Sequence, residues 1–81
     1  MKPLKIPKPT TSKPNWTFGM RLYNARRNKG LTQEELARKA RCNVHTVNRY
    51  ERDLINPSLF IVADLAKILE VSIDYLVYGK E

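Results

Sequence analysis

Two helix starts lie eleven residues apart in the middle of the chain, and this spacing limits the fold more than any other feature. Thr32 and Glu35 have the spacing of a capping box, in which each side chain accepts a hydrogen bond from the other residue's backbone amide. Asn43 is a favourable N-cap for a second helix over 43–52. Because the first helix runs to about Ala40, the sequence predicts two short helices joined by a tight turn.

The rest of the chain has the same helical period and shows no strand pattern. Polar residues that can cap a helix precede three further segments, which we place at 18–29, 59–69 and 73–78. Arg21 falls among the polar residues of the first of these helices. The predicted inward residues are Phe18, Leu22, Ala25, Leu36, Ala37, Ala40, Val47, Tyr50, Leu59, Val62, Leu65, Ala66 and Leu69. The predicted class is all-α, a compact domain of five helices.

Length and composition exclude several classes of protein. A chain of 81 residues accommodates one domain and buries too little surface for a deep cleft between lobes. A single cysteine, Cys42, and a single histidine, His45, exclude an internal disulfide and a four-ligand zinc site. We therefore expect no metal, no cofactor, no small-molecule ligand and no enzymatic activity. The chain lacks an apolar run for a membrane span or a signal peptide, which favours a cytoplasmic protein.

Positive charge is concentrated away from the C-terminal end of the chain, which has a net charge of +7. Residues 18–52 hold nine basic residues and three acids, whereas residues 53–81 hold two basic residues and five acids. Such a chain presents a basic end to a polyanion. Nucleic acid is the first candidate, because neutralising phosphates releases counterions. An anionic membrane is the rival, and the plain alternative is that the charge only keeps the protein soluble.

We expect residues 1–17, which are rich in proline and lysine, to form a flexible arm ahead of the domain that we place at 18–79. Proline fixes φ and removes amide donors, so an extended segment is expected there. The lysines that could reach a nucleic-acid groove or its phosphates are Lys2, Lys5, Lys8 and Lys13. Ordinary disordered termini have the same composition, so both interpretations remain open.

A series of motifs in chain order carries a family resemblance. They are Phe18-Gly19, Arg26, Gly30-Leu31-Thr32-Gln33-Glu34-Glu35-Leu36-Ala37, Thr46-Val47, Tyr50-Glu51-Arg52, Asn56-Pro57-Ser58, Leu65-Ala66-Lys67, Leu69, Val71-Ser72-Ile73-Asp74 and Leu76. On these residues, roughly three-quarters of the chain resembles the lambda-repressor-like helix-turn-helix domain of phage Cro and repressor proteins, a large family of bacterial transcription regulators. The resemblance implies five helices, DNA recognition by the third, and dimeric binding to an inverted-repeat operator.

The resemblance also implies which side chains meet DNA. Val44, His45 and Arg49 match residues that reach base edges, and Thr46 and Asn48 match positions near a base or a phosphate. The implied phosphate contacts are Thr32, Gln33, Asn43 and Arg52. Arg49 suits a bidentate pair with guanine, and Val44 suits a thymine methyl group, so we expect G and T among the bases read.

Other matched positions have structural roles. Arg26 and Glu51 match an internal ion pair, and Cys42 falls where the family has a buried apolar residue. Glycine is frequent in the family at three positions that follow helices, and these hold Arg41, Asp53 and Glu70 here. If these residues adopt left-handed angles, each costs about 1 kcal/mol.

Apolar side chains in the loop after 43–52 and in the last helix indicate a self-association surface. The residues of this predicted surface are Leu54, Ile55, Phe60, Tyr75 and Tyr78. A homodimer would place two recognition helices, each 43–52, about 34 Å apart on double-stranded DNA. The sequence therefore favours a sequence-specific transcriptional repressor. The alternative is an antitoxin or adaptor-type interaction module of the same fold, whose apolar surface binds a protein partner.

Overall fold

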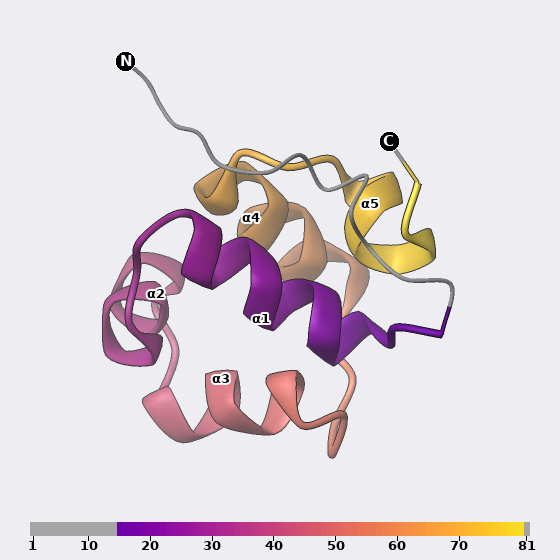
Figure 1. Cartoon of the computed structure of the whole chain (residues 1–81). Helices are drawn as coiled ribbons and strands as arrows, with labels where there is room; N and C mark the ends of the chain where they lie inside the picture. The colour runs from indigo at the N-terminus through magenta and orange to yellow at the C-terminus, as the bar shows by residue number, and fades with distance from the viewer. Residues whose placement is uncertain (1–14, 81) are drawn as a thin grey trace.

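The computed structural model describes residues 15–80, which fold into five helices without strands (Figure 1). The helices are α1 (Phe18–Asn28), α2 (Gln33–Ala40), α3 (Val44–Glu51), α4 (Leu59–Leu69) and α5 (Ile73–Tyr78). The predicted all-α class with five helices is confirmed. The expected contacts of the arm, through Lys2, Lys5, Lys8 and Lys13, lie outside the described residues.

Every one of these helices begins at a polar residue whose side chain accepts an amide hydrogen from the first turn. The caps are Thr17, Thr32, Asn43, Ser58 and Ser72. The predicted capping box is complete, since the Glu35 amide donates to Thr32 Oγ1 at 3.0 Å and the Thr32 amide donates to Glu35 Oε1 at 2.8 Å. The hydrogen bond from the Thr32 backbone lowers the pKa of Glu35.

One apolar core joins all five helices. Its fully buried side chains are Leu22, Leu36, Val47, Leu65, Tyr75 and Leu76. Phe18 and Ala40 are only partly buried, and the prediction that Leu59 faces inward is wrong, because its side chain is 68% exposed. Helix α4 enters the core only from its second turn, where Val62 is buried, so the first residue of the helix lies outside.

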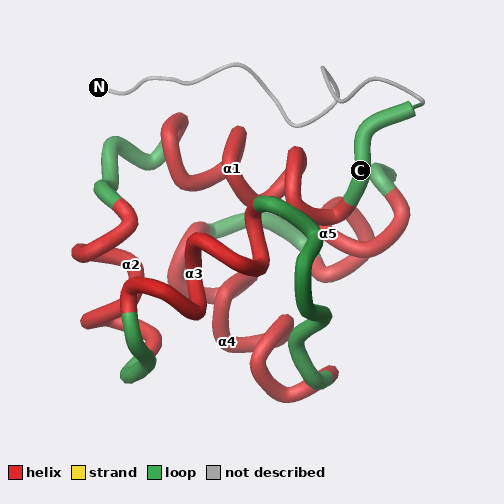
Figure 2. Tube along the Cα trace, turned by 90° about the horizontal axis from the view of Figure 1, so that it is seen from below, coloured by secondary structure: helices red, strands yellow, loops and turns green. Residues whose placement is uncertain are grey.

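The helices leave the outer side of α3 uncovered. α3 packs against α1 and α2, while α4 contacts α2 and α5, and α5 contacts α1. In Figure 1, α3 forms the lower edge of the domain, and no other helix lies below it. From below (Figure 2), α3 crosses in front of α4. One face of α3 therefore points to solvent across its whole length.

α1 approaches the C-terminal end of α3 closely at Gly19. A Cβ atom at Gly19 would lie 2.4 Å from the carbonyl oxygen of Glu51 and 2.7 Å from that of Tyr50. Asp53 holds the two segments together, because its carboxylate accepts hydrogen bonds from the Gly19 amide, at 2.9 Å, and from the Thr17 hydroxyl. Sequence reasoning missed this role of Asp53.

The three residues that stand where the family often has glycine all adopt left-handed angles. Their φ angles are 59° at Arg41, 60° at Asp53 and 59° at Glu70. Each costs about 1 kcal/mol relative to a right-handed residue. Asp53 offsets this cost with its hydrogen bonds to α1, and Glu70 forms an ion pair with Lys29 at 2.8 Å.

Two side chains that the sequence placed at the surface are buried. Arg21 is 7% exposed, and its guanidinium donates to the carbonyls of Trp16 at 2.7 Å, Leu76 at 2.9 Å and Val77 at 2.8 Å. A cation suits this place because the last carbonyls of a helix carry partial negative charge. Tyr75, predicted for the self-association surface, is 1% exposed in the core and therefore is not part of any surface.

Candidate nucleic-acid interface

The outer face of α3 is polar and open to solvent. His45 and Arg49, which lie one helical turn apart, are both exposed. Thr46 and Asn48 are half-buried at the edges of the same face. Four of the five predicted base-contacting residues therefore share a surface that can enter a groove about as wide as a helix.

Val44, the fifth predicted base contact, differs from the others. It is the first residue of α3, and its side chain packs partly against the core. Only part of the isopropyl group is available to a thymine methyl group, so this contact stays a prediction.

Two predicted phosphate contacts, Thr32 and Asn43, use their side-chain oxygens as helix caps. Thr32 Oγ1 accepts from the Glu35 amide, and Asn43 Oδ1 accepts from the His45 amide at 2.7 Å. Both residues therefore mark helix N-termini, where the helix dipole and the first amides favour an anion. The amide nitrogen of Asn43 is not used by its cap and can donate outward.

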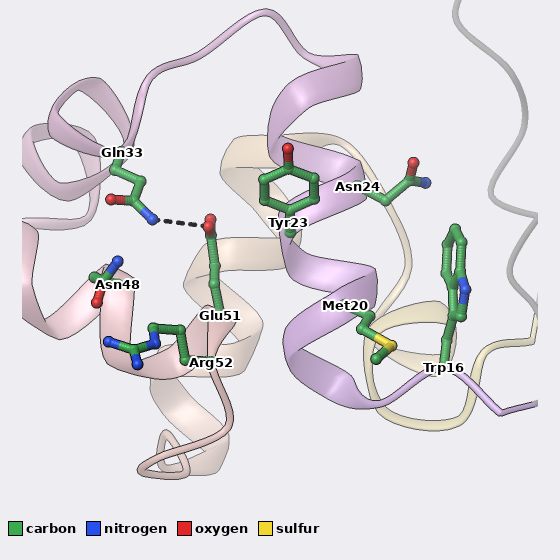
Figure 3. A pocket seen from close by; sticks show the side chains of 8 residues that line it. All are labelled: Trp16, Met20, Tyr23, Asn24, Gln33, Asn48, Glu51 and Arg52. Carbon is green, nitrogen blue, oxygen red and sulfur yellow. Dashed lines mark hydrogen bonds between the residues drawn. The ribbon is translucent and has the colours of Figure 1, made fainter.

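A buried network joins three helices behind this face. Arg26 Nε donates to Glu51 Oε2 at 2.6 Å, and Arg26 Nη2 donates to Glu51 Oε1 at 3.1 Å. The predicted ion pair is confirmed, with side-chain exposures of 8% and 4%. Gln33 Nε2 also donates to Glu51 Oε1, at 2.9 Å, which the sequence did not reveal (Figure 3). The network fixes the start of α2 relative to α1 and α3.

The acids at the C-terminal end of α3 are therefore engaged by protein groups. Glu51 is neutralised by Arg26, and Asp53 accepts from the start of α1. The exposed charges of α3 and its cap are the guanidinium groups of Arg49 and Arg52. This distribution gives the face a positive potential toward a polyanion.

A hollow of about 740 Å³ lies at the start of α2. Its lining residues are Arg26, Arg27, Gly30, Leu31, Thr32, Gln33, Glu34 and Val44. Beside it, Arg26 and Arg27 lie over the ring of Tyr23, with 5.2 Å and 5.6 Å from guanidinium carbon to ring centroid. A helix N-terminus next to arginine side chains is suited to holding a phosphate group.

Cys42 lies in the turn between α2 and α3 and is half-buried against the core, as its predicted apolar position implies. Burial raises the pKa of its thiol, so the reactive thiolate is disfavoured. Among the described residues, the helices all lack the combined length and apolar character that crossing a membrane requires.

Exposed apolar side chains gather in the loop after α3 and on the outer sides of α4 and α5. Leu54, Ile55, Phe60 and Tyr78 of the predicted self-association surface are exposed, and Phe60 reaches 81% exposure. Leu59 is also exposed and belongs with these residues, whereas Tyr75 is buried and does not. Apolar residues this exposed are typical of an interaction surface.

Comparison with known proteins supports one family. Residues 22–76 match the helix-turn-helix family. The chain is 37% identical over 65 residues to the HTH-type transcriptional regulator ImmR of Bacillus subtilis (strain 168). This match covers 80% of the chain but only 50% of ImmR, so the chain spans about half the length of that relative.

Two solved structures share the fold. The P22 c2 repressor, in complex with a synthetic operator, matches with a TM-score of 0.78 over 82% of this chain and 100% of its own, at 24% identity. SinR, a master regulator for biofilm formation in complex with DNA, is 33% identical with a TM-score of 0.70, over 74% of this chain and 97% of its own. The chain therefore belongs to the helix-turn-helix family, and its domain shares the fold of the P22 c2 repressor and of SinR.

Proposed function

We propose that the protein is a DNA-binding transcriptional regulator that inserts α3 into the major groove. The observation that carries this proposal is the outer face of α3, where Arg49 and His45 are exposed while Glu51 is neutralised from behind. A helix of this size fits the major groove of B-DNA, and its face offers hydrogen-bond donors without a free carboxylate. The complex of SinR with DNA supports the same use of the fold.

Base recognition is assigned to the exposed side of α3. Arg49 would pair bidentately with guanine O6 and N7, and His45 would donate or accept at a neighbouring base. Thr46 and Asn48 flank these two residues, and Val44 offers a methyl contact to thymine. Of these side chains, Arg49 has the most to contribute to specificity.

Phosphate contacts are assigned to the groups around α3. Gln33 is held by Glu51 at the start of α2, where the helix dipole favours an anion. Thr32 and Asn43 mark helix N-termini, and Arg52 extends from the C-terminal end of α3. The arm lysines, Lys2, Lys5, Lys8 and Lys13, would add sequence-independent affinity.

We extend the proposal to a cytoplasmic homodimer that represses by occupying an inverted-repeat operator. The exposed residues for the dimer contact are Leu54, Ile55, Leu59, Phe60 and Tyr78. A two-fold dimer would present two α3 helices to half-sites about 34 Å apart. Occupancy of the operator alone would then block access to a promoter.

Selection from a random duplex library at near-physiological salt tests the proposal, because this salt suppresses non-specific phosphate binding. Enrichment of an inverted repeat is expected, with a half-site spacing of about one helical turn. Enrichment of a single half-site would retain DNA recognition and refute the dimer.

A protein-interaction module is the second candidate function, and the exposed apolar side chains favour it. Five large apolar residues near the ends of α3, α4 and α5 exceed what a helix-turn-helix needs to bind DNA. If folded protein enriches no sequence from the library, this candidate replaces the first. The apolar surface would then bind another protein.

A further inference from the structure

A second hollow, of about 510 Å³, lies along the outer side of α1 and reaches the start of α2 and the end of α3 on one side and Trp16 on the other (Figure 3). One wall comes from α1 and the residues before it, and the other comes from the start of α2 and the end of α3. The lining residues are Trp16, Met20, Tyr23 and Asn24 on the first wall and Gln33, Asn48, Glu51 and Arg52 on the second. We call this hollow the α1 groove.

The first wall of the α1 groove is largely apolar. Met20 is 48% exposed, Tyr23 is 46% exposed, and Trp16 is half-buried beside them. Met20, Tyr23 and Asn24 lie three and four residues apart on one side of α1, away from the core residue Leu22. Core packing therefore does not account for the large side chains on this wall.

The second wall is polar and continues the candidate interface. Gln33, Asn48 and Arg52 are all predicted DNA contacts, and all three line the α1 groove. Glu51 does not repel an anion there, because its carboxylate accepts from both Arg26 and Gln33. The groove thus combines an apolar wall with a wall of hydrogen-bond donors.

Tyr23, which lines this space, has a hydroxyl hydrogen in addition to the bond that its oxygen accepts. Its hydroxyl oxygen accepts a hydrogen bond from Arg27 Nη1 at 2.9 Å, so the hydroxyl hydrogen can donate to another acceptor. The neighbouring guanidinium group of Arg27 adds positive potential around the ring. An anionic acceptor, such as a phosphate oxygen, matches this site.

We propose that the α1 groove holds the sugar–phosphate backbone of one strand of duplex DNA. A DNA strand alternates an apolar deoxyribose with an anionic phosphate, and the two walls offer the matching surfaces. Deoxyribose would lie against Met20 and Trp16, while phosphate oxygens would accept from Tyr23 and Arg52. The proposal rests on the proposed function and adds an α1 contact surface to it.

Trp16 is the only tryptophan of the chain, so its fluorescence reports on the groove directly. The full chain is titrated with a labelled duplex, while label anisotropy follows binding and Trp16 emission follows the groove. We expect the emission to change in parallel with the anisotropy. Saturated binding with unchanged emission would overturn the groove proposal and leave the proposed function intact. An absence of binding to any duplex would overturn both.

Introducing a negative charge into the α1 groove tests the contact through the affinity for DNA. Met20→Glu places a carboxylate in the first turn of α1, where an acid favours the helix, so folding is retained. Ile73→Glu is the matched control, because Ile73 has similar exposure in the first turn of α5, away from α3. We expect Met20→Glu to weaken binding about tenfold on operator and random duplex alike.

We expect the ratio of the affinity for the operator to the affinity for a random duplex to stay unchanged, since contacts to the DNA backbone carry no base information. Affinity equal to that of the Ile73→Glu control would refute the proposal. A loss on the operator alone would also refute it, because Met20 would then contact a base.

Discussion

Replacing Gly19 by alanine tests the close packing of α1 against the C-terminal end of α3. A new Cβ would lie 2.4 Å from the Glu51 carbonyl oxygen, 2.7 Å from the Tyr50 carbonyl oxygen and 2.8 Å from Asp53 Oδ2. The first two atoms belong to the backbone of α3 and cannot turn away as a flexible side chain would. α1 must therefore move away from the end of α3.

The magnitude follows from three terms. Overpacking of this kind costs about 1–3 kcal/mol. Lengthening the hydrogen bond from the Gly19 amide to the Asp53 carboxylate, now 2.9 Å, adds about 1–2 kcal/mol. The higher helix propensity of alanine returns about 1 kcal/mol. We expect a net loss of about 1–4 kcal/mol, against a total stability of about 4–12 kcal/mol for 81 residues.

The assay is thermal and urea unfolding followed by circular dichroism, with Gly30→Ala as the control. Gly30 has a φ of +80° but no atom within 4 Å of a new Cβ, so its substitution costs only the strain of the angle, about 1 kcal/mol. Gly19→Ala should lower Tm by about 4–32 °C and by more than Gly30→Ala. A Tm equal to that of the wild type, or a larger loss for Gly30→Ala, would refute the argument.

Four further predictions concern binding, stability and reactivity. Arg49→Ala should weaken operator binding by about 1–3 kcal/mol and leave random-duplex binding nearly unchanged in a filter or anisotropy assay. Equal losses on both would make Arg49 a phosphate contact. Glu51→Gln should destabilise the domain by about 3–5 kcal/mol in urea unfolding, because it leaves Arg26 buried without its carboxylate, and an unchanged midpoint would contradict this. Deleting residues 2–13 should flatten the salt dependence of DNA binding, and an identical slope would show that the arm lysines make no phosphate contacts. Cys42 should react with iodoacetamide more slowly than a free thiol at pH 7.5, since its raised pKa reduces the thiolate, and its rate should keep rising above pH 9.

Helix boundaries were predictable because the cap residues act locally. Thr32 and Asn43 each accept an amide hydrogen two or three residues ahead, a relation that is visible in the sequence itself. The family resemblance also pointed to the position of Asp53, which follows a helix where the family often has glycine, although it left the backbone angle open. The family resemblance supplied the partner of Arg26.

Residues whose roles depend on distant segments were not predictable in this way. Arg21 is polar by type, yet its three carbonyl acceptors belong to Trp16 and to residues more than fifty positions further along the chain. Leu59 has the spacing of the inward-facing residues of α4, but the first residue of that helix to be buried in the core is Val62. The α1 groove likewise needs the packing of three helices, which no local pattern encodes.

The buried guanidinium of Arg21 has a mechanical consequence. It binds the carbonyl of Trp16, where the chain enters the domain, and those of Leu76 and Val77, where the chain leaves it. A force that pulls these two ends apart therefore loads the two hydrogen bonds from Arg21 to Leu76 and Val77 in parallel. Bonds loaded in parallel share the force, so the segment before α1 and the end of α5 separate only when both of these bonds break.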